Sequence, residues 1–167
     1  MSNPANMRSL LENVRIREAV AADVEALTRL INSAFVVERV AFEGDRVNAD
    51  KVRTYMNSGN FLLVENPSQL VGCVYVELDG LRSYLGLLSV DPPRQGSGLG
   101  RWLVAAAEDF ARAAGCRVMD LRVVSPRSEL LPFYQRLGYK ETGTAPFAHG
   151  VTANVPAHYI LMSKSLV

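Results

Sequence analysis

The chain lacks a large excess of charge of either sign: 18 Lys and Arg stand against 17 Asp and Glu, a formal net charge of +1 over 167 residues. Non-specific binding to the phosphate backbone of nucleic acids needs an excess of positive charge, so nucleic acid is not expected as a main partner. No run of about 18 apolar residues occurs, which excludes an ordinary membrane-spanning helix. The first 20 residues have no continuous apolar stretch and no small-residue cleavage site, so we expect no secretory signal and a cytoplasmic location.

Cysteine is scarce as well. Only Cys73 and Cys116 are present, each within an apolar run that is typical of a strand or a strand entry. Neither has a second Cys or a His at metal-ligand spacing, so we expect two buried free thiols and no metal site.

What is present fits an ordinary globular enzyme or binding domain. Hydrophobic residues make up 49% of the chain and charged residues 21%, enough to bury a core and too apolar for a disordered protein. A length of 167 residues predicts one domain. We place a polar leader at 1–13 and the domain at 14–167.

Apolar periodicity and turn residues predict the order strand, helix, helix, three strands, helix, strand, helix and two strands. The fold class is therefore α+β, with a central, mostly antiparallel sheet of about six or seven strands and about four helices. Residues 38–46 are charged, contain a glycine and are predicted as a loop. The predicted strands cover 14–19, 61–64, 70–78, 81–90, 118–124, 140–144 and 157–166, and the helices 22–35, 48–56, 99–114 and a short segment ending at 137.

The most informative segment is 88–101, where a strand leads through three alternate glycines into a helix. Free backbone N–H groups converge at a helix start and favour a phosphate or pyrophosphate ligand. A dinucleotide fingerprint fails, because the position of its third glycine is Arg101 or Leu103, and a Walker A loop fails for want of Gly-Lys. A purely structural turn is the alternative.

The segment fits the pattern Q/R-x-x-G-x-G/A, read as Gln95-Gly96-Ser97-Gly98-Leu99-Gly100, and here the chain resembles the GNAT N-acetyltransferase superfamily. A second segment agrees: Leu131-Pro-Phe-Tyr134-Gln-Arg-Leu-Gly-Tyr139 is similar to the family's downstream helix motif. The element order agrees over about residues 14–166, and two motifs at the expected separation are more specific than either alone.

The resemblance implies that the chain uses acetyl-CoA. It implies that the pyrophosphate binds the glycine loop and that the pantetheine arm pairs with the strand ending at Val90, which must splay from the strand containing Val123. Backbone N–H groups at Leu88 to Val90 are then candidate oxyanion donors. The residues implied in cofactor binding are Leu88, Ser89, Val90, Gln95, Gly96, Ser97, Gly98, Leu99, Gly100, Arg101 and Tyr134.

The resemblance also implies that Tyr134 is the general acid that protonates the departing thiolate, although a packing role for its ring is the alternative. In the histone-acetylating branch a glutamate stands eleven residues before the loop glutamine, whereas this chain has Tyr84 there. The general base is therefore open. Glu77 is the first candidate, followed by His149 and His158.

The acceptor side is expected to combine aromatic and acidic residues, which suits a small-molecule amine. Arg39 and Arg46 could instead meet a carboxylate of the acceptor. A non-catalytic acyl-CoA-binding module and a protein or peptide N-acetyltransferase are the alternatives, and a homodimer is left open. The candidate acceptor residues are Phe35, Glu38, Phe42, Glu43, Tyr84, Phe147 and His149.

Overall fold

A seven-stranded sheet organises the chain, in a computed structural model that describes residues 13–147 and 152–167. The strand order is β1-β2-β3-β4-β5-β7-β6, and every neighbouring pair is antiparallel except β4 and β5. The predicted α+β class is confirmed. The strands are β1 (Arg15–Glu18), β2 (Asn60–Glu65), β3 (Leu70–Asp79), β4 (Arg82–Val90), β5 (Val118–Val124), β6 (Lys140–Pro146) and β7 (His158–Ser165).

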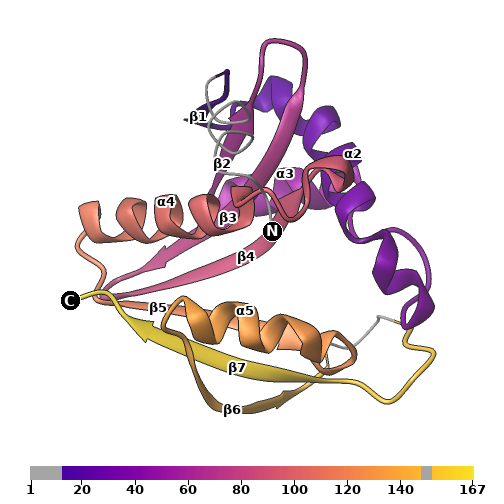
Figure 1. The fold of residues 1–167 in the computed structure, drawn as a ribbon, viewed down its shortest axis with the longest axis vertical. Helices are drawn as coiled ribbons and strands as arrows, with labels where there is room; N and C mark the ends of the chain where they lie inside the picture. The colour runs from indigo at the N-terminus through magenta and orange to yellow at the C-terminus, as the bar shows by residue number, and fades with distance from the viewer. Residues whose placement is uncertain (1–12, 148–151) are drawn as a thin grey trace.

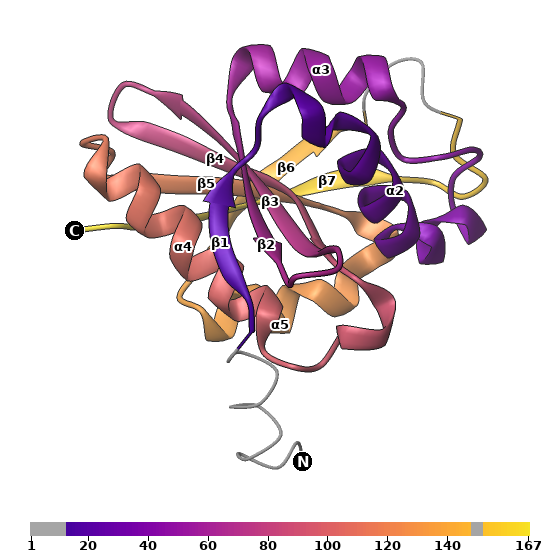
Figure 2. The same cartoon turned by 90° about the horizontal axis from the view of Figure 1, so that it is seen from above.

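Helices cover both faces of the sheet. Figure 2 shows α2 and α3 on one side and α4 and α5 on the other. One prediction is wrong in part: the loop at 38–46 begins within a 3-10 turn, because the Glu38 N–H bonds the Phe35 carbonyl at 3.0 Å and the Ala41 N–H bonds the Glu38 carbonyl at 2.9 Å. The helices are α2 (Val24–Ala34), α3 (Ala49–Ser58), α4 (Leu99–Ala113) and α5 (Leu131–Arg136), and the 3-10 turns are η1 (Ala21–Asp23), η2 (Val36–Val40), η3 (Pro92–Arg94) and η4 (Ser125–Leu130).

Two apolar clusters form, one on each face of the sheet. On one face, α4 buries Leu103 and Ala107 against β3 and β4, while on the other α2 buries Leu27 and Ile31. Both helices place apolar residues three or four positions apart, which is why the sequence predicts them well. Cys73 and Cys116 are buried and free, as expected.

The leader predicted at 1–13 lies outside the described residues except for Asn13. In the described part of the chain, no helix is long and apolar enough to cross a bilayer.

The parallel pair β4 and β5 separates along its length. The two strands are paired only from Arg82 with Val118 to Tyr84 with Asp120. Figure 1 shows them together at the left and diverging to the right. Among residues 13–147 and 152–167, no strand therefore pairs with the edge of β4 from Leu85 to Val90 on this side. This is the splay that the family resemblance implies for this pair.

A bulge in β4 lies in the splayed part. Tyr75 pairs with Gly86 and Cys73 with Ser89, so two residues of β4 face one residue of β3. Leu87 adopts φ 49°, the only positive φ of a described residue other than glycine. Such a bulge re-aims side chains: Leu87 packs with the α2 face, although Leu85 packs with the α4 face.

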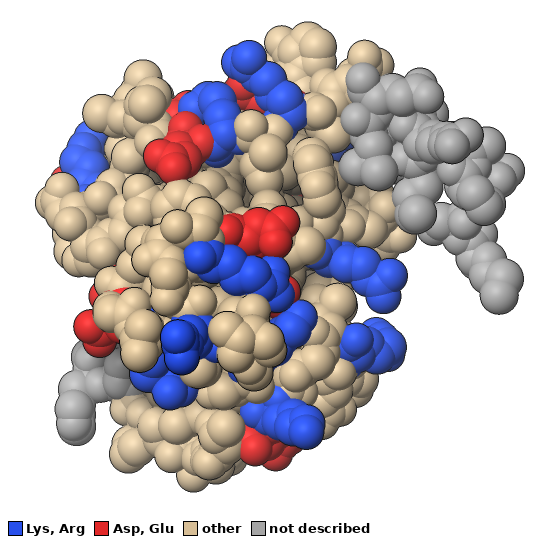
Figure 3. Space-filling view, turned by 90° about the vertical axis from the view of Figure 1, so that its left-hand side faces the viewer, with Lys and Arg blue, Asp and Glu red and all other residues tan. Residues whose placement is uncertain are grey.

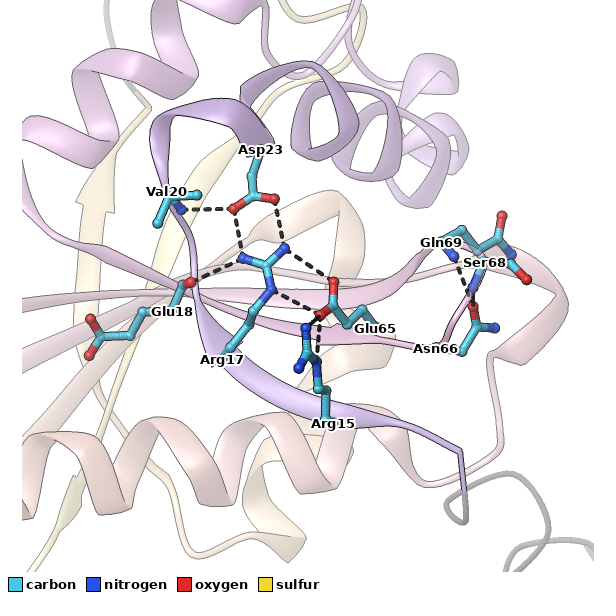
Figure 4. Close-up of polar contacts among 9 residues, drawn as sticks. All are labelled: Arg15, Arg17, Glu18, Val20, Asp23, Glu65, Asn66, Ser68 and Gln69. Atoms are coloured by element: carbon cyan, nitrogen blue, oxygen red, sulfur yellow. Dashed lines mark hydrogen bonds and ion pairs between the residues drawn. The ribbon is translucent and has the colours of Figure 1, made fainter.

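Arg17 connects the edge strand β1 to the rest of the sheet (Figure 4). Its guanidinium donates to both carboxylate oxygens of Asp23 at 2.8 Å and to Glu65 at 3.0 and 3.1 Å. Asp23 also accepts from the Val20 backbone N–H at 2.7 Å. Hydrogen bonds from Arg17 hold the pKa of Asp23 and of Glu65 below their ordinary values.

This cluster predicts acid-sensitive stability. A carboxyl with a lowered folded pKa adds stability above the unfolded pKa of about 4, and that stability is lost as the pH falls towards the folded pKa. We expect Arg17→Met to lower the unfolding free energy at pH 7 by about 2 kcal/mol, because Asp23 loses its charged donor, and to weaken the dependence on pH between about 5 and 3. Urea unfolding across this range measures both effects.

Arg15→Met is the matched control. Arg15 also contacts Glu65, but its side chain is 76% exposed, so we expect a loss below about 1 kcal/mol. Equal acid dependence in wild type and Arg17→Met would contradict the assignment.

Candidate active site

A cleft of about 1180 Å³ occupies the space where β4 and β5 splay. Its walls come from β4, the glycine loop and the start of α4, and from β5, η4 and α5. Towards one end of the cleft, the segment after α2 continues the first of these walls, and residues near the end of β6 continue the second. The site is therefore assembled from segments that are far apart in the sequence.

The glycine loop forms one end of the cleft. Gly96 and Gly98 adopt φ 78° and 93°, a left-handed conformation that side chains disfavour. Gln95 closes the loop by donating its Nε2 to the Val90 carbonyl at 3.3 Å. Ser97 lines the cleft, and its hydroxyl is the only buried side-chain N or O of the described residues without a hydrogen-bond partner.

These features fit the phosphate end of acetyl-CoA. An orphaned hydroxyl and the first-turn N–H groups of α4, which cannot pair within the helix, are donors for an anion. Most of the predicted cofactor residues line the cleft: Leu88, Val90, Gln95, Gly96, Ser97, Gly98, Gly100, Arg101 and Tyr134. Ser89 and Leu99 are buried and do not line it, because the Ser89 hydroxyl bonds the Leu87 carbonyl and Leu99 packs into the core.

Tyr134 lies on α5 at the wall of the cleft. Its ring packs edge-on against Phe133 at 5.0 Å and Tyr139 at 5.9 Å between centroids. Gly138, with φ 98°, ends the helix and lets the Tyr139 N–H reach the Tyr134 carbonyl at 3.1 Å, the helix end that the sequence predicts.

The Tyr134 hydroxyl is suited to hold a proton. No hydrogen bond to it is found within the described chain. Burial raises the pKa of this hydroxyl above its ordinary value, nearby Tyr84 raises it further, and Arg127 opposes the shift. The group is therefore protonated at neutral pH and available to a ligand.

The base candidates lie elsewhere. Glu77 does not line the cleft; it stands opposite Tyr84 in the β3–β4 register and accepts a hydrogen bond from the Tyr75 hydroxyl at 2.7 Å. His158 is exposed at the start of β7 and does not line the cleft either. His149 lies outside the described residues. The structure thus brings Glu77 near the cleft wall without exposing it to the cleft.

The other end of the cleft is aromatic. Phe42 and Phe147 stack at 5.0 Å between centroids, and Phe147 contacts Tyr159 at 5.2 Å. The two loops that hold these rings are joined where the Glu43 N–H donates to the Thr152 carbonyl at 3.2 Å. All the predicted acceptor residues within the described chain line the cleft: Phe35, Glu38, Phe42, Glu43, Tyr84 and Phe147.

Glu38 is the buried acid of this end, at 9% exposure. Its carboxylate lies 3.3 Å from Arg127 Nη1 and 4.0 Å from Arg46 Nε. Burial raises the pKa of Glu38, whereas Arg46 and Arg127 oppose the shift. Arg127 comes from η4, so this pair connects the two walls of the cleft.

Sequence reasoning missed Arg122, Arg127 and Tyr159, all of which line the cleft. One local signal existed for Arg122. Residues of β5 alternate between buried and more exposed positions, and Arg122 lies between buried Leu121 and Val123. This alternation places Arg122 on the face away from the core. Nothing local indicates that this face meets the cleft.

The charge of the cleft differs from that of the whole chain. Seven basic side chains line it against three acidic ones, although the chain has a formal charge of only +1. On the opposite side of the molecule, where β4 and β5 meet, Figure 3 shows acidic groups among the basic ones. The cleft therefore attracts anions locally.

Comparison with known proteins agrees with this architecture. A profile described as the Acetyltransferase (GNAT) family matches residues 24–139, more than half of the chain. The structure of YncA, a putative acetyltransferase from Salmonella typhimurium with its cofactor acetyl-CoA, is 25% identical with a TM-score of 0.72, over 93% of this chain and 95% of that one. A putative GNAT acetyltransferase from Desulfovibrio desulfuricans, 18% identical, has a TM-score of 0.76 over 92% and 99%.

Some of the curated relatives are much longer than this chain. A mycothiol acetyltransferase of Amycolatopsis mediterranei is 28% identical over 142 residues, 78% of this chain and 47% of that protein. The L-amino acid N-acyltransferase MnaT of Escherichia coli is 29% identical over 142 residues, 78% of this chain and 82% of that protein. The chain spans about half the length of the mycothiol acetyltransferases that it matches.

Proposed function

The chain belongs to the GNAT family of acetyltransferases, and we propose that it transfers the acetyl group of acetyl-CoA to the primary amine of a small molecule, by direct attack in a ternary complex. One observation supports this most strongly. The cleft joins an anion-binding glycine loop, an unpaired strand edge and a protonated tyrosine in one continuous space. These are the groups that phosphate binding, amide pairing and proton donation require.

Different segments of the chain would bind different parts of acetyl-CoA. The loop from Gln95 to Arg101 would hold the phosphates, and the free edge of β4 would pair with the amides of the pantetheine arm. Acetyl-CoA, when bound, supplies an activated acetyl thioester. Backbone N–H groups between Leu88 and Val90 would then donate to the thioester oxygen as negative charge develops on it.

Proton transfer completes the reaction. The new bond joins the amine nitrogen to the acetyl carbon, and the carbon–sulfur bond breaks. Tyr134 would donate its proton to the departing sulfur, and the nitrogen would lose a proton to a base. We keep Glu77 as the candidate base, acting through water, because it stands opposite Tyr84 in the strand register but does not line the cleft.

A small acceptor is favoured by the shape of the acceptor end. The stacked pair Phe42 and Phe147 and the Glu38–Arg127 pair enclose it from both walls. The name of the relative MnaT, an L-amino acid N-acyltransferase, also refers to a small acceptor.

Acetyl-CoA should stabilise the protein. At about 100 times its dissociation constant, a ligand adds roughly 2.7 kcal/mol, which for a chain of this size raises the melting temperature by roughly 5 to 10 °C. A thermal-shift titration with acetyl-CoA measures this, with adenosine as a control that lacks the pyrophosphate and the pantetheine arm. No shift at saturating acetyl-CoA would refute the binding proposal.

Turnover is measured as CoA thiol release with a panel of amines, with mass spectrometry of the N-acetyl product. Acetyl-CoA binding without turnover on any amine or peptide would indicate a non-catalytic module. Turnover confined to peptides would refute the small-molecule acceptor.

A further inference from the structure

Three arginines of the cleft lining form no ion pair within the described residues: Arg94 and Arg101 at the glycine loop, and Arg122 at the acceptor end. Arg122, in the middle of β5, lines the cleft, and no carboxylate in residues 13–147 and 152–167 forms an ion pair with it. On the neighbouring strand, Arg82 is held by Asp120 at 2.6 Å. The two arginines differ in this respect: the charge of Arg82 is balanced within the sheet, and that of Arg122 is not.

Arg122 is nevertheless held in place by aromatic rings. Its Cζ lies 4.3 Å from the ring centroid of Tyr159 and 5.7 Å from that of Tyr84. A guanidinium over an aromatic face keeps its N–H donors in its own plane, where they can meet a planar anion in a bidentate manner. The rings therefore orient Arg122 without neutralising it.

The neighbouring charges do not supply the missing anion. Arg46 and Arg127 both pair with Glu38, Arg127 pairs also with Glu129, and Arg39 pairs with Asp45. None of these carboxylates pairs with Arg122, and the cleft lining as a whole has seven basic side chains against three acidic ones. Such a cleft repels a polyamine and attracts a molecule with an anionic group.

We propose that the acceptor is a small amine that also has a carboxylate, and that Arg122 binds this carboxylate and determines acceptor specificity. The inference rests on the proposed acetyl transfer, but it uses other residues than the glycine loop and Tyr134. Tyr84 connects the two regions, since its ring contacts Arg122 and it acts electrostatically on the Tyr134 hydroxyl. The amine and the carboxylate therefore fit within one small molecule.

Matched acceptors test this. Each amino acid in a panel is compared with its carboxamide, which keeps the shape and the amine but removes the negative charge. We expect kcat/KM to be at least about tenfold higher for the best amino acid than for its amide. In Arg122→Gln we expect KM for that amino acid to rise about 10- to 100-fold, because a charged hydrogen bond is lost. The kcat for the amino acid and the kinetic constants for its amide should change little.

Two further variants sharpen the result. Arg122→Lys keeps the positive charge but lacks the paired N–H donors of a guanidinium. It should retain part of the preference for the amino acid over its amide. Arg117→Gln removes an exposed arginine outside the cleft lining, five residues away, and should leave all constants unchanged. Titration calorimetry of the same acceptor pairs into CoA-loaded protein gives a readout that does not need turnover.

The outcomes separate the two proposals. Turnover or binding that favours the amide, a polyamine or O-phosphoethanolamine over every amino acid would overturn the carboxylate site and leave acetyl transfer intact. Calorimetric preference for the amino acid, lost in Arg122→Gln, would support the site even if no turnover were found and the proposed function failed. Equal binding of both members of every pair would overturn it.

Discussion

Replacing Tyr134 with phenylalanine should lower kcat by roughly 10²- to 10⁴-fold, the usual contribution of a general acid or base. The change removes one oxygen from a ring that packs between Phe133 and Tyr139. The hydroxyl has no protein partner within the described chain, so its loss should cost little folding stability. Steady-state CoA release gives kcat, and calorimetry gives the dissociation constant of acetyl-CoA, which should change by less than about threefold.

Tyr55→Phe is the matched control for this variant. Tyr55 is a half-buried tyrosine on α3 that does not line the cleft, and its hydroxyl should not affect turnover. Wild-type kcat in Tyr134→Phe would exclude Tyr134 as the proton donor. A parallel loss of acetyl-CoA binding would indicate that the hydroxyl binds the cofactor rather than protonating the sulfur.

Gly96→Val should weaken acetyl-CoA binding by about tenfold or more. Gly96 adopts φ 78° at the cleft, a conformation that costs a residue with a Cβ roughly 1 to 2 kcal/mol, and more for a β-branched one. If the loop relaxes to relieve this strain, its N–H donors leave the positions that bind the phosphates. Restoring those positions in the complex then costs the strain energy again and weakens binding by that amount. Calorimetry with acetyl-CoA measures the loss.

Gly115→Val separates backbone strain from cofactor binding. Gly115 has φ 90° at the other end of α4, and a Cβ there, as at Gly96, would meet nothing within 4 Å. Both variants introduce the same kind of strain, but only Gly96 lines the cleft. Equal acetyl-CoA affinity in the two variants would refute a specific role for the loop.

The parts of the site that are continuous in sequence could be predicted. The glycine loop and the end of α5 depend on neighbouring residues only: Gly98 begins one helix and Gly138 ends another, both at positive φ. Hydrogen bonds over three to five residues and the absence of a Cβ decide such features. Tyr134 was likewise indicated because its helix motif is local.

The acceptor end could not be predicted in the same way. Glu38 and Arg127 are 89 residues apart, and the pair forms only because η2 and η4 stand on opposite walls of the cleft. The β4 bulge is also invisible in the sequence, since Leu85 and Leu87 would face the same side of a regular strand.

Local sequence patterns were enough to predict the order of the elements, the glycine loop and the helix that contains Tyr134, because helix periodicity, strand alternation and glycine conformations act over a few residues. The near-neutral charge of the chain gave no indication of a basic cleft. The tertiary structure, by contrast, sets the point at which β4 and β5 separate, after Tyr84. It also places Arg122 in the cleft lining, where no carboxylate of the described chain forms an ion pair with it. Strand register and packing between distant segments set these features, and no local pattern encodes them.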